Sequence, residues 1–257
     1  MHEFPVLEIG GLNIDVSTFL GIIVSSIIVL ILARLSVRNL SVTNPSKMQN
    51  FMEWVIDFVH GIIASTMPLS KAKNYISLGM TIMMFIFVAN LLGLPFGIVT
   101  THEQPVEWFG YTIISQETIN NAHGDHGAEI AWWKSPTADI SVTFGLAIVV
   151  FFLIHFLGLK QNRKHYLKHY LEPFWFFLPL NLIKVVSKPL TLGLRLYANI
   201  FAGEVLIATI LMAGVFGTPL LLAWQGFSIF VAAIQAFLFT ILTMVYISEA
   251  TVHEEDH

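Results

Sequence analysis

The sequence predicts an all-α polytopic membrane protein with five membrane-crossing helices and one amphipathic helix on the cytoplasmic membrane surface. Of the 257 residues, 55% are hydrophobic and only 12% are charged, which is about half the charged share of a soluble domain. Several uncharged windows are long enough to cross a hydrocarbon core of about 30 Å, which takes roughly 20 apolar residues. Lys and Arg gather in alternate loops, a pattern that sets the orientation of membrane helices.

Composition also excludes several classes of protein. The chain has no cysteine, so we expect no disulfide scaffold, no thiolate nucleophile and no Cys-ligated metal site. Thirteen Lys and Arg stand against 17 Asp and Glu, which leaves no basic surplus for binding nucleic acid. We therefore expect no cofactor, no bound metal and no nucleic-acid partner.

The expected elements form one membrane domain over residues 1–257. In chain order they are an outer N-terminal segment (1–15), span 1 (16–33), the surface helix (44–67), span 2 (74–101), an outer loop (102–139), span 3 (140–159), a cytoplasmic loop (160–172), span 4 (173–214), span 5 (219–250) and a cytoplasmic tail (251–257).

The first three elements with helical character differ in polarity. Residues 16–33 are an uncharged window between Asp15 and Arg34, and no Lys or Arg precedes it, so a cleavable signal is not expected. Residues 44–67 are too polar to cross the membrane, but they have the apolar spacing of a helix that lies on its surface. That spacing is carried by Phe51, Trp54, Val55, Phe58, Val59 and Ile62. Residues 74–101 are uncharged again and predict span 2.

The outer loop is acidic and contains several histidines. Its run His123-Gly-Asp-His126 suggests a metal site, but no spacing in it matches a helical or knuckle site. We favour a solvated loop with some affinity for divalent ions, and a cation-collecting antenna outside an ion entry is the alternative.

The C-terminal third predicts a helical hairpin. Residues 140–159 form span 3, whereas the uncharged window 205–248 is about twice as long as one crossing needs. Gly214, Gly217, Thr218 and Pro219 therefore predict a tight turn between spans 4 and 5. Span 5 would be about 48 Å long as a helix, which requires a strong tilt in the membrane.

The positions of Lys and Arg predict an outer N-terminus and a cytoplasmic C-terminus. Five of these residues separate spans 1 and 2, and four follow span 3, whereas the outer loop has only one. They are Arg34, Arg38, Lys47, Lys71 and Lys73, then Lys160, Arg163, Lys164 and Lys168, and finally Lys134.

Span 4 carries charges that a lipid environment should reject, since Arg at a bilayer centre costs about 2.5–3.5 kcal/mol on insertion scales. Lys184, Lys188, Arg195 and Asn199 fall within about 60° on one helical face, and Glu204 points to the opposite face about 13 Å farther along the axis. Intramembrane ionisable groups are functional by default. The alternative is that Arg195 pairs with Glu204 and merely joins helices, and that the two lysines reach lipid headgroups.

Span 5 has a polar seam of its own. Ser228, Gln235, Tyr246 and Glu249 fall within a sector of about 60°. Gln235 is the only strongly polar residue near the middle of the span. The alternative role of this glutamine is also to hold helices together.

Four segments in these regions resemble those of one protein family. Residues 187–204, SKPLTLGLRLYANIFAGE, closely resemble the signature of subunit a of F-type ATP synthases. Residues 235–248 are similar to the family's last-helix motif, residues 90–95 to its second-span ending, and residues 49–53 to the start of its surface helix. The resemblance covers essentially the whole chain in order.

The resemblance implies a stator that works against a rotating ring of c subunits, each with a buried carboxyl. Arg195 would be the essential arginine facing the ring, Asn199 and Gln235 would flank it, and Glu204 would line an outer aqueous half-channel. Ser228 stands where many relatives have a histidine, which leaves Glu204 without that ionisable partner. Further candidate channel-lining residues are Ser228, Asp139, Glu249 and Tyr246.

The implied function is proton translocation through two offset half-channels, coupled to rotation for ATP synthesis. By itself the chain would be no enzyme but a non-catalytic ion-channel subunit, in the bacterial plasma membrane. Implied partners are the c-subunit ring, the b-subunit peripheral stalk, other synthase subunits indirectly, and membrane lipids.

Two other function classes fit the sequence less well. A self-contained ion transporter would be supported by inverted repeats, and the chain has no matching halves. An intramembrane enzyme needs a nucleophile–base pair or metal ligands at membrane depth, but the spans contain only one histidine, His155, near a cytoplasmic end.

Overall fold

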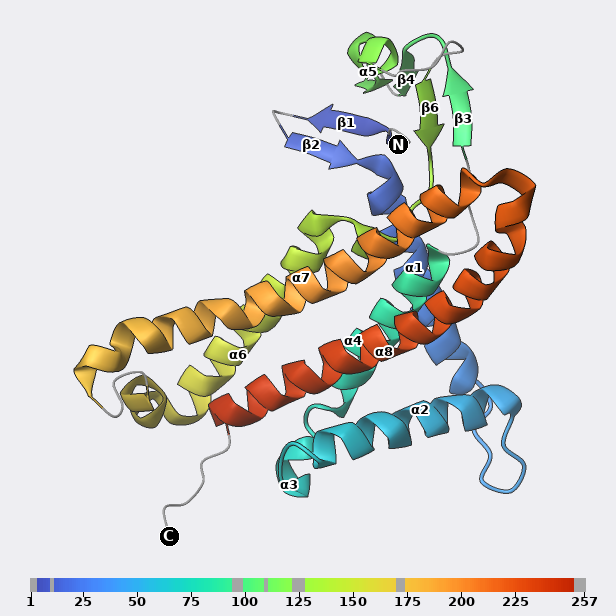
Figure 1. Ribbon diagram of the computed structural model, residues 1–257. Coiled ribbons are helices and arrows are strands. Elements are labelled where there is room, and N and C mark those ends of the chain that lie inside the picture. The colour runs from blue at the N-terminus through green and yellow to red at the C-terminus, as the bar shows by residue number, and fades with distance from the viewer. Residues whose placement is uncertain are drawn as a thin grey trace.

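The computed structural model describes residues 4–9, 12–93, 99–108, 111–121, 128–169 and 174–251, and helices dominate them (Figure 1). The helices are α1 (Val16–Ser36), α2 (Lys47–Ala64), α3 (Leu69–Ala72), α4 (Ile76–Leu92), α5 (Gln116–Asn121), α6 (Ile140–His169), α7 (Leu178–Leu211) and α8 (Thr218–Thr251). Three short 3₁₀ turns, η1 (Pro136–Ala138), η2 (Trp175–Phe177) and η3 (Gly214–Gly217), connect them.

Four segments of the described chain are long and apolar enough to cross a membrane: Val16–Ser36, Ile140–Gln161, Leu178–Leu211 and Gly214–Thr251. They correspond to the predicted spans 1, 3, 4 and 5. The fifth apolar helix, α4, has 17 residues, or about 26 Å, slightly less than a hydrocarbon core of about 30 Å.

The predicted end of span 2 at residue 101 is wrong. Helix α4 ends at Leu92, and Val99–His102 is strand β3. The physical reason is in the sequence, because Gly93 and Pro95 both oppose continuation of a helix.

Among the described residues, six short strands, which the all-α prediction did not include, form three two-stranded antiparallel sheets at one end of the helices (Figure 1). β1 (Val6–Ile9) pairs with β2 (Leu12–Asp15), β3 with β6 (Ala128–Ala131), and β4 (Val106–Trp108) with β5 (Tyr111–Ile114). All of them lie in the segments predicted to be outside the membrane, apart from β3, of which only His102 does.

The predicted cytoplasmic loop 160–172 is also partly wrong, because α6 continues as a helix to His169. Charged residues ended the apolar window at Lys160, but charge stops membrane burial and does not stop a helix. The helix therefore extends beyond its apolar segment.

Helix α2 lies at the end of the molecule opposite the strands (Figure 1). The Ser46 hydroxyl caps it by accepting from the Gln49 amide at 3.1 Å. The apolar positions of α2 divide between two faces: one is buried against the protein, and the other exposes aromatic rings. The buried set includes Val55, Val59 and Ile62, and the exposed set is Phe51, Trp54 and Phe58.

The core lies where α4, α6, α7 and α8 pack together. Its fully buried side chains include Ile86 of α4, Leu192 and Leu196 of α7, and Phe239 and Met244 of α8. Most outward side chains of these helices are large and apolar, as lipid-facing surfaces require.

Helices α7 and α8 form the predicted hairpin, and both lie across α1 at a wide angle (Figure 1). Gly214 in the η3 turn has φ +58°, a left-handed conformation that favours glycine. The hairpin and its turn therefore match the sequence prediction, with boundaries shifted by one to three residues at the turn.

Candidate functional site

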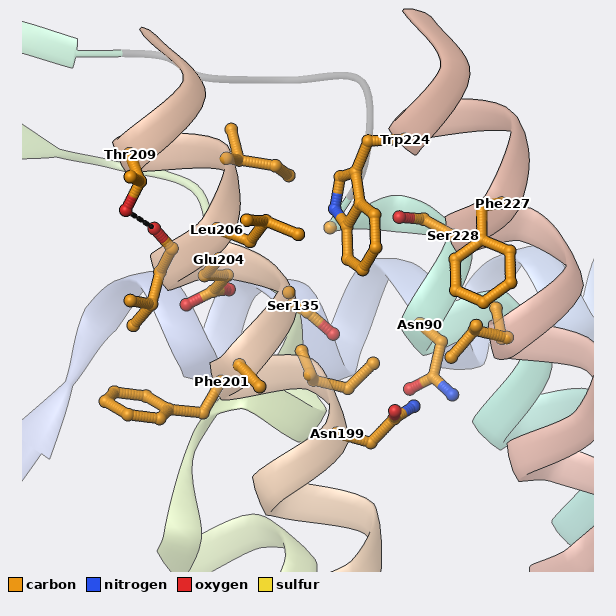
Figure 2. Close-up of a pocket in the computed structure, with 18 residues that line it drawn as sticks. Asn90, Ser135, Asn199, Phe201, Glu204, Leu206, Thr209, Trp224, Phe227 and Ser228 are labelled. Atoms are coloured by element: carbon orange, nitrogen blue, oxygen red, sulfur yellow. Dashed lines mark hydrogen bonds between the residues drawn. The ribbon is translucent and has the colours of Figure 1, made fainter. Parts of the chain in front are cut away.

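A cavity of about 620 Å³ lies between α7 and α8 near the hairpin turn (Figure 2). Its walls come from residues 199–207 and 209 of α7, residues 224, 227, 228, 231 and 232 of α8, the end of α4 and Ser135. Three predicted site residues meet here: Asn199, Glu204 and Ser228. Although Asn199 and Glu204 lie on different faces of α7, the cavity follows the helix far enough round to reach both.

Arg195 lies one turn from this cavity, on the N-terminal side of Asn199 in α7. The helix face that carries Leu192 and Leu196 is buried, whereas Arg195 is exposed. Arg195 and Glu204 form no salt bridge with each other, and the guanidinium forms no ion pair with any residue in the described ranges. The alternative in which Arg195 and Glu204 pair with each other is therefore wrong.

The polar seam of α8 is buried where it faces the other helices. Ser228 is 9% exposed and Gln235 is 5% exposed. Ser228 reaches the cavity, and Gln235 lies two turns farther toward the C-terminal end of α8, beyond the lining. Arg195 and Gln235 are therefore on the same side of the cavity along the hairpin.

Asn90 joins the cavity from α4 and was not predicted as a site residue. It is 2% exposed, and its Oδ1 accepts a hydrogen bond from the Thr137 hydroxyl. Thr137 also shares a 2.7 Å hydrogen bond with Ser135, whose hydroxyl donates to the Ala89 carbonyl at 2.9 Å. In Figure 2 the side chains of Asn90 and Asn199 extend toward each other.

Two buried N–H groups of the cavity have no partner among the described residues, Asn90 Nδ2 and Trp224 Nε1. Buried polar groups are normally hydrogen-bonded, to protein or to water. With the Glu204 carboxylate and the Ser228 hydroxyl in the same lining, this cavity has the size and the polar partners to hold water.

A second cluster lies at the other end of the hairpin. Lys188 of α7 forms an ion pair with Glu249 of α8, and its Nζ lies 4.9 Å from the centroid of the Tyr246 ring. Lys188 therefore has a protein partner on α8, which the sequence did not predict. Lys184 is exposed and forms no ion pair within the described ranges.

Asp139 lies outside the cavity lining, in a third cluster. Lys134 Nζ is 2.5 Å from Asp15 Oδ2 and 3.2 Å from Asp139 Oδ2. Burial raises the pKa of Asp139, but the Ser141 amide, which donates at 2.8 Å, and the charge of Lys134 outweigh burial and hold this pKa below its ordinary value.

The run His123–His126 and the tail after Thr251 lie outside the described residues. Within the described part of the chain, His, Asp and Glu form no group of three or more that could hold a metal. The structure therefore leaves the interpretation of the histidine loop as it stood.

Sequence reasoning missed Asn90, Trp224 and the role of Lys134. Trp224 could have been found, because it precedes Ser228 by four residues and so shares its helical face. Asn90 is the first residue of the motif 90–95, which the sequence analysis related only to the end of a span.

Comparison with known proteins identifies close relatives. A family described as ATP synthase A chain matches residues 18–248. ATP synthase subunit a of Bacillus subtilis (strain 168) is 43% identical, over 98% of this chain and 99% of the relative. The Anoxybacillus flavithermus (strain DSM 21510 / WK1) subunit a is 45% identical over 98% and 99%. The Lysinibacillus sphaericus (strain C3-41) protein of the same name is 42% identical over 100% and 99%.

Proposed function

We propose that Arg195 separates two offset half-channels along a rotating c-subunit ring. The premise is that this chain belongs to the ATP synthase A chain family. Members of this family are the membrane-embedded, proton-translocating stator component of bacterial F-type ATP synthases. The observation that carries the proposal is the exposed Arg195 guanidinium near the middle of α7, which forms no ion pair with any described residue. A charge in that position would be costly in lipid without a partner. A carboxyl on a neighbouring subunit supplies one.

Arg195 would act on the protonation of the ring carboxyl. Facing lipid, that carboxyl is protonated because desolvation raises its pKa. Beside a guanidinium, which does not lose its charge, the carboxylate is favoured, so the proton leaves toward the cytoplasm. The same fixed charge would block direct proton flow between the half-channels.

The cavity would be the outer half-channel. Glu204, Asn199 and Ser228 line it, and the unpaired N–H groups of Asn90 and Trp224 support a path through ordered water. With Ser228 at the position where many relatives have histidine, water would link Glu204 to the ring without a second ionisable side chain. Gln235 would flank Arg195 from α8.

The membrane arrangement is part of the same proposal. α1, α4, α6, α7 and α8 would be the five crossings, with the N-terminus outside and the C-terminus in the cytoplasm of a bacterial cell. α2 would lie on the cytoplasmic leaflet, where its exposed Phe51, Trp54 and Phe58 suit the interface. The b-subunit stalk would be a second partner in the complex.

The test is ATP-driven proton pumping by the assembled complex in proteoliposomes. Arg195→Ala should abolish pumping, because no fixed charge remains to deprotonate the ring carboxyl. Lys184→Ala, on the same face of α7 but exposed and without an ion pair in the described ranges, should retain most of it. Full coupled pumping by the Arg195 variant would refute the proposal, and selective conduction by the chain without a ring would favour a self-contained transporter.

A further inference from the structure

The hairpin helices α7 and α8 carry only two carboxylates, and they lie on opposite sides of Arg195. Glu204 is nine residues toward the outer end of α7. Glu249 pairs with Lys188, which precedes Arg195 by seven residues. Seven residues of helix span about 10 Å and nine span about 13 Å. Along the axis of α7, Glu249 is therefore held closer to Arg195 than Glu204 is.

Lys188 holds the Glu249 side chain in place with help from α8 itself. Its ammonium forms the ion pair with Glu249 and lies over the ring of Tyr246, at 4.9 Å from the ring centroid. Tyr246 precedes Glu249 by three residues, almost one helical turn. The ammonium therefore has two partners on one face of α8.

Arg195 is the next cation outward on the same face as Lys188, about 20° away around the helix. It forms no ion pair with a described residue. A guanidinium stays charged and binds carboxylates in a fork geometry. A released glutamate side chain at this end of the hairpin would be attracted to it.

We propose that Lys188 is a positioning residue that keeps Glu249 away from Arg195, so that Arg195 stays available to the carboxyl of the c ring. This rests on the proposed function, in which Arg195 receives that carboxyl. Lys188 is then needed only because Glu249 is present. Removal of Lys188 harms proton transfer, and additional removal of Glu249 repairs it.

Lys184 could partly replace Lys188. It lies four residues nearer the cytoplasmic end of α7, about 6 Å along the axis, and it is exposed without an ion pair among the described residues. Lys184→Met therefore serves as the matched control, and the double variant Lys184→Met/Lys188→Met removes any substitute partner for Glu249.

The experiment measures ATP-driven proton pumping by proteoliposomes that contain equal amounts of assembled complex. Lys188→Met should slow pumping roughly 10- to 20-fold, as expected for a unit charge about 10 Å away at an effective dielectric constant of about 20. The Lys184/Lys188 double variant should be at least as slow. Lys184→Met and the conservative Lys188→Arg should pump as the parent does. Lys188→Met/Glu249→Gln should recover most of the rate, and Glu249→Gln alone should pump faster than Lys188→Met.

A purely structural ion pair gives a different pattern. Glu249→Gln would then be as slow as Lys188→Met and the double variant no faster, which overturns the proposal. Parental pumping by the Lys184/Lys188 double variant overturns it too. If Lys188→Met does not assemble, the Lys188/Glu249 double variant decides: assembly with pumping supports the proposal, and failure overturns it. Failure of the proposed function is seen separately, as pumping by Arg195→Ala.

Discussion

Glu204 is the only carboxylate in the lining of the cavity between α7 and α8, and no described residue forms an ion pair with it. Its lining neighbours Asn90, Ser228 and Trp224 offer N–H and O–H groups. Such neighbours bind water or a carboxylate oxygen but exchange no proton of their own near neutral pH. Glu204 would thus be the one group in this lining that can release and accept protons.

Glu204→Gln should therefore slow proton-driven ATP synthesis in proteoliposomes without reducing the amount of assembled complex. The amide keeps the size and hydrogen-bonding capacity of the side chain but does not titrate. The matched control is Asp57→Asn, a change at an exposed carboxylate of α2. Loss of assembly at normal expression would show that Glu204 mainly holds helices together.

At the residue scale, charge was visible in the sequence and neutral polarity was not. Arg195 and Glu204 could be identified because ionisable side chains are costly within an apolar span and are usually functional there. Asn90 and Trp224 are ordinary residues for a helix end. They become informative only when the structure shows that each has a buried N–H group without a partner among the described residues. For Asn90, the Thr137 hydroxyl donates to the amide oxygen, and the amide nitrogen is the atom left without a partner.

At the element scale, the length of an apolar window predicts that a helix crosses, but not where the helix ends. α4 ends early because Gly93 and Pro95 act locally, and α6 continues past Lys160 because helix formation tolerates charge. The strands contain three or four residues each. Segments so short show no reliable alternation of polar and apolar residues.

The turn between α7 and α8 depends on Gly217 as well as Gly214. A Cβ at residue 217 would lie 2.3 Å from the Ile210 carbonyl oxygen, which accepts the Ala213 amide at 3.1 Å and so ends α7. Because the obstacle is backbone, the turn would have to shift. We expect Gly217→Ala to destabilise the chain by about 1–3 kcal/mol.

The measurement is thermal unfolding of the full chain in lipid nanodiscs, followed by circular dichroism. Gly226→Ala is the matched control, since a Cβ at that position in α8 meets no atom within 4 Å. It should leave stability unchanged or slightly raised. Equal melting temperatures for the two variants would mean that the turn adjusts without cost.

At the scale of the whole molecule, one lysine joins segments that are far apart in the sequence. Lys134 contacts Asp15 before α1 and Asp139 before α6, and its ammonium lies 4.2 Å from the centroid of the Phe4 ring. Asp15 also caps α1 by accepting from the Thr18 amide at 3.1 Å. No sequence pattern predicts this cluster, because its members are joined only by the folded arrangement of α1, the segment before α6, and α6.

The Lys134 side chain is only 11% exposed, so its removal leaves two carboxylates close together without a counter-charge. Breaking such a buried pair typically costs about 3–5 kcal/mol. Lys134→Met should therefore lower the melting temperature of the chain in nanodiscs strongly at pH 7. Lys73→Met, at an exposed lysine near α4, is the control and should change it little.

The pH dependence of the same melting temperature tests the cause. The pKa of Asp139 in the folded chain lies below its ordinary value of 3.8, so its carboxylate stabilises the fold fully above about pH 3.8 and loses that effect as the pH falls through the lower, folded value. The contribution of Asp139 to the melting temperature of the parent should therefore be constant from pH 7 to pH 5. In stronger acid this contribution is lost and the melting temperature should fall. In Lys134→Met the attraction that lowers this pKa is gone, so the acid-induced loss should be smaller. An unchanged acid profile in this variant would show that Lys134 does not stabilise the Asp139 carboxylate, and that the N-terminal segment and the segment before α6 are held together by other contacts.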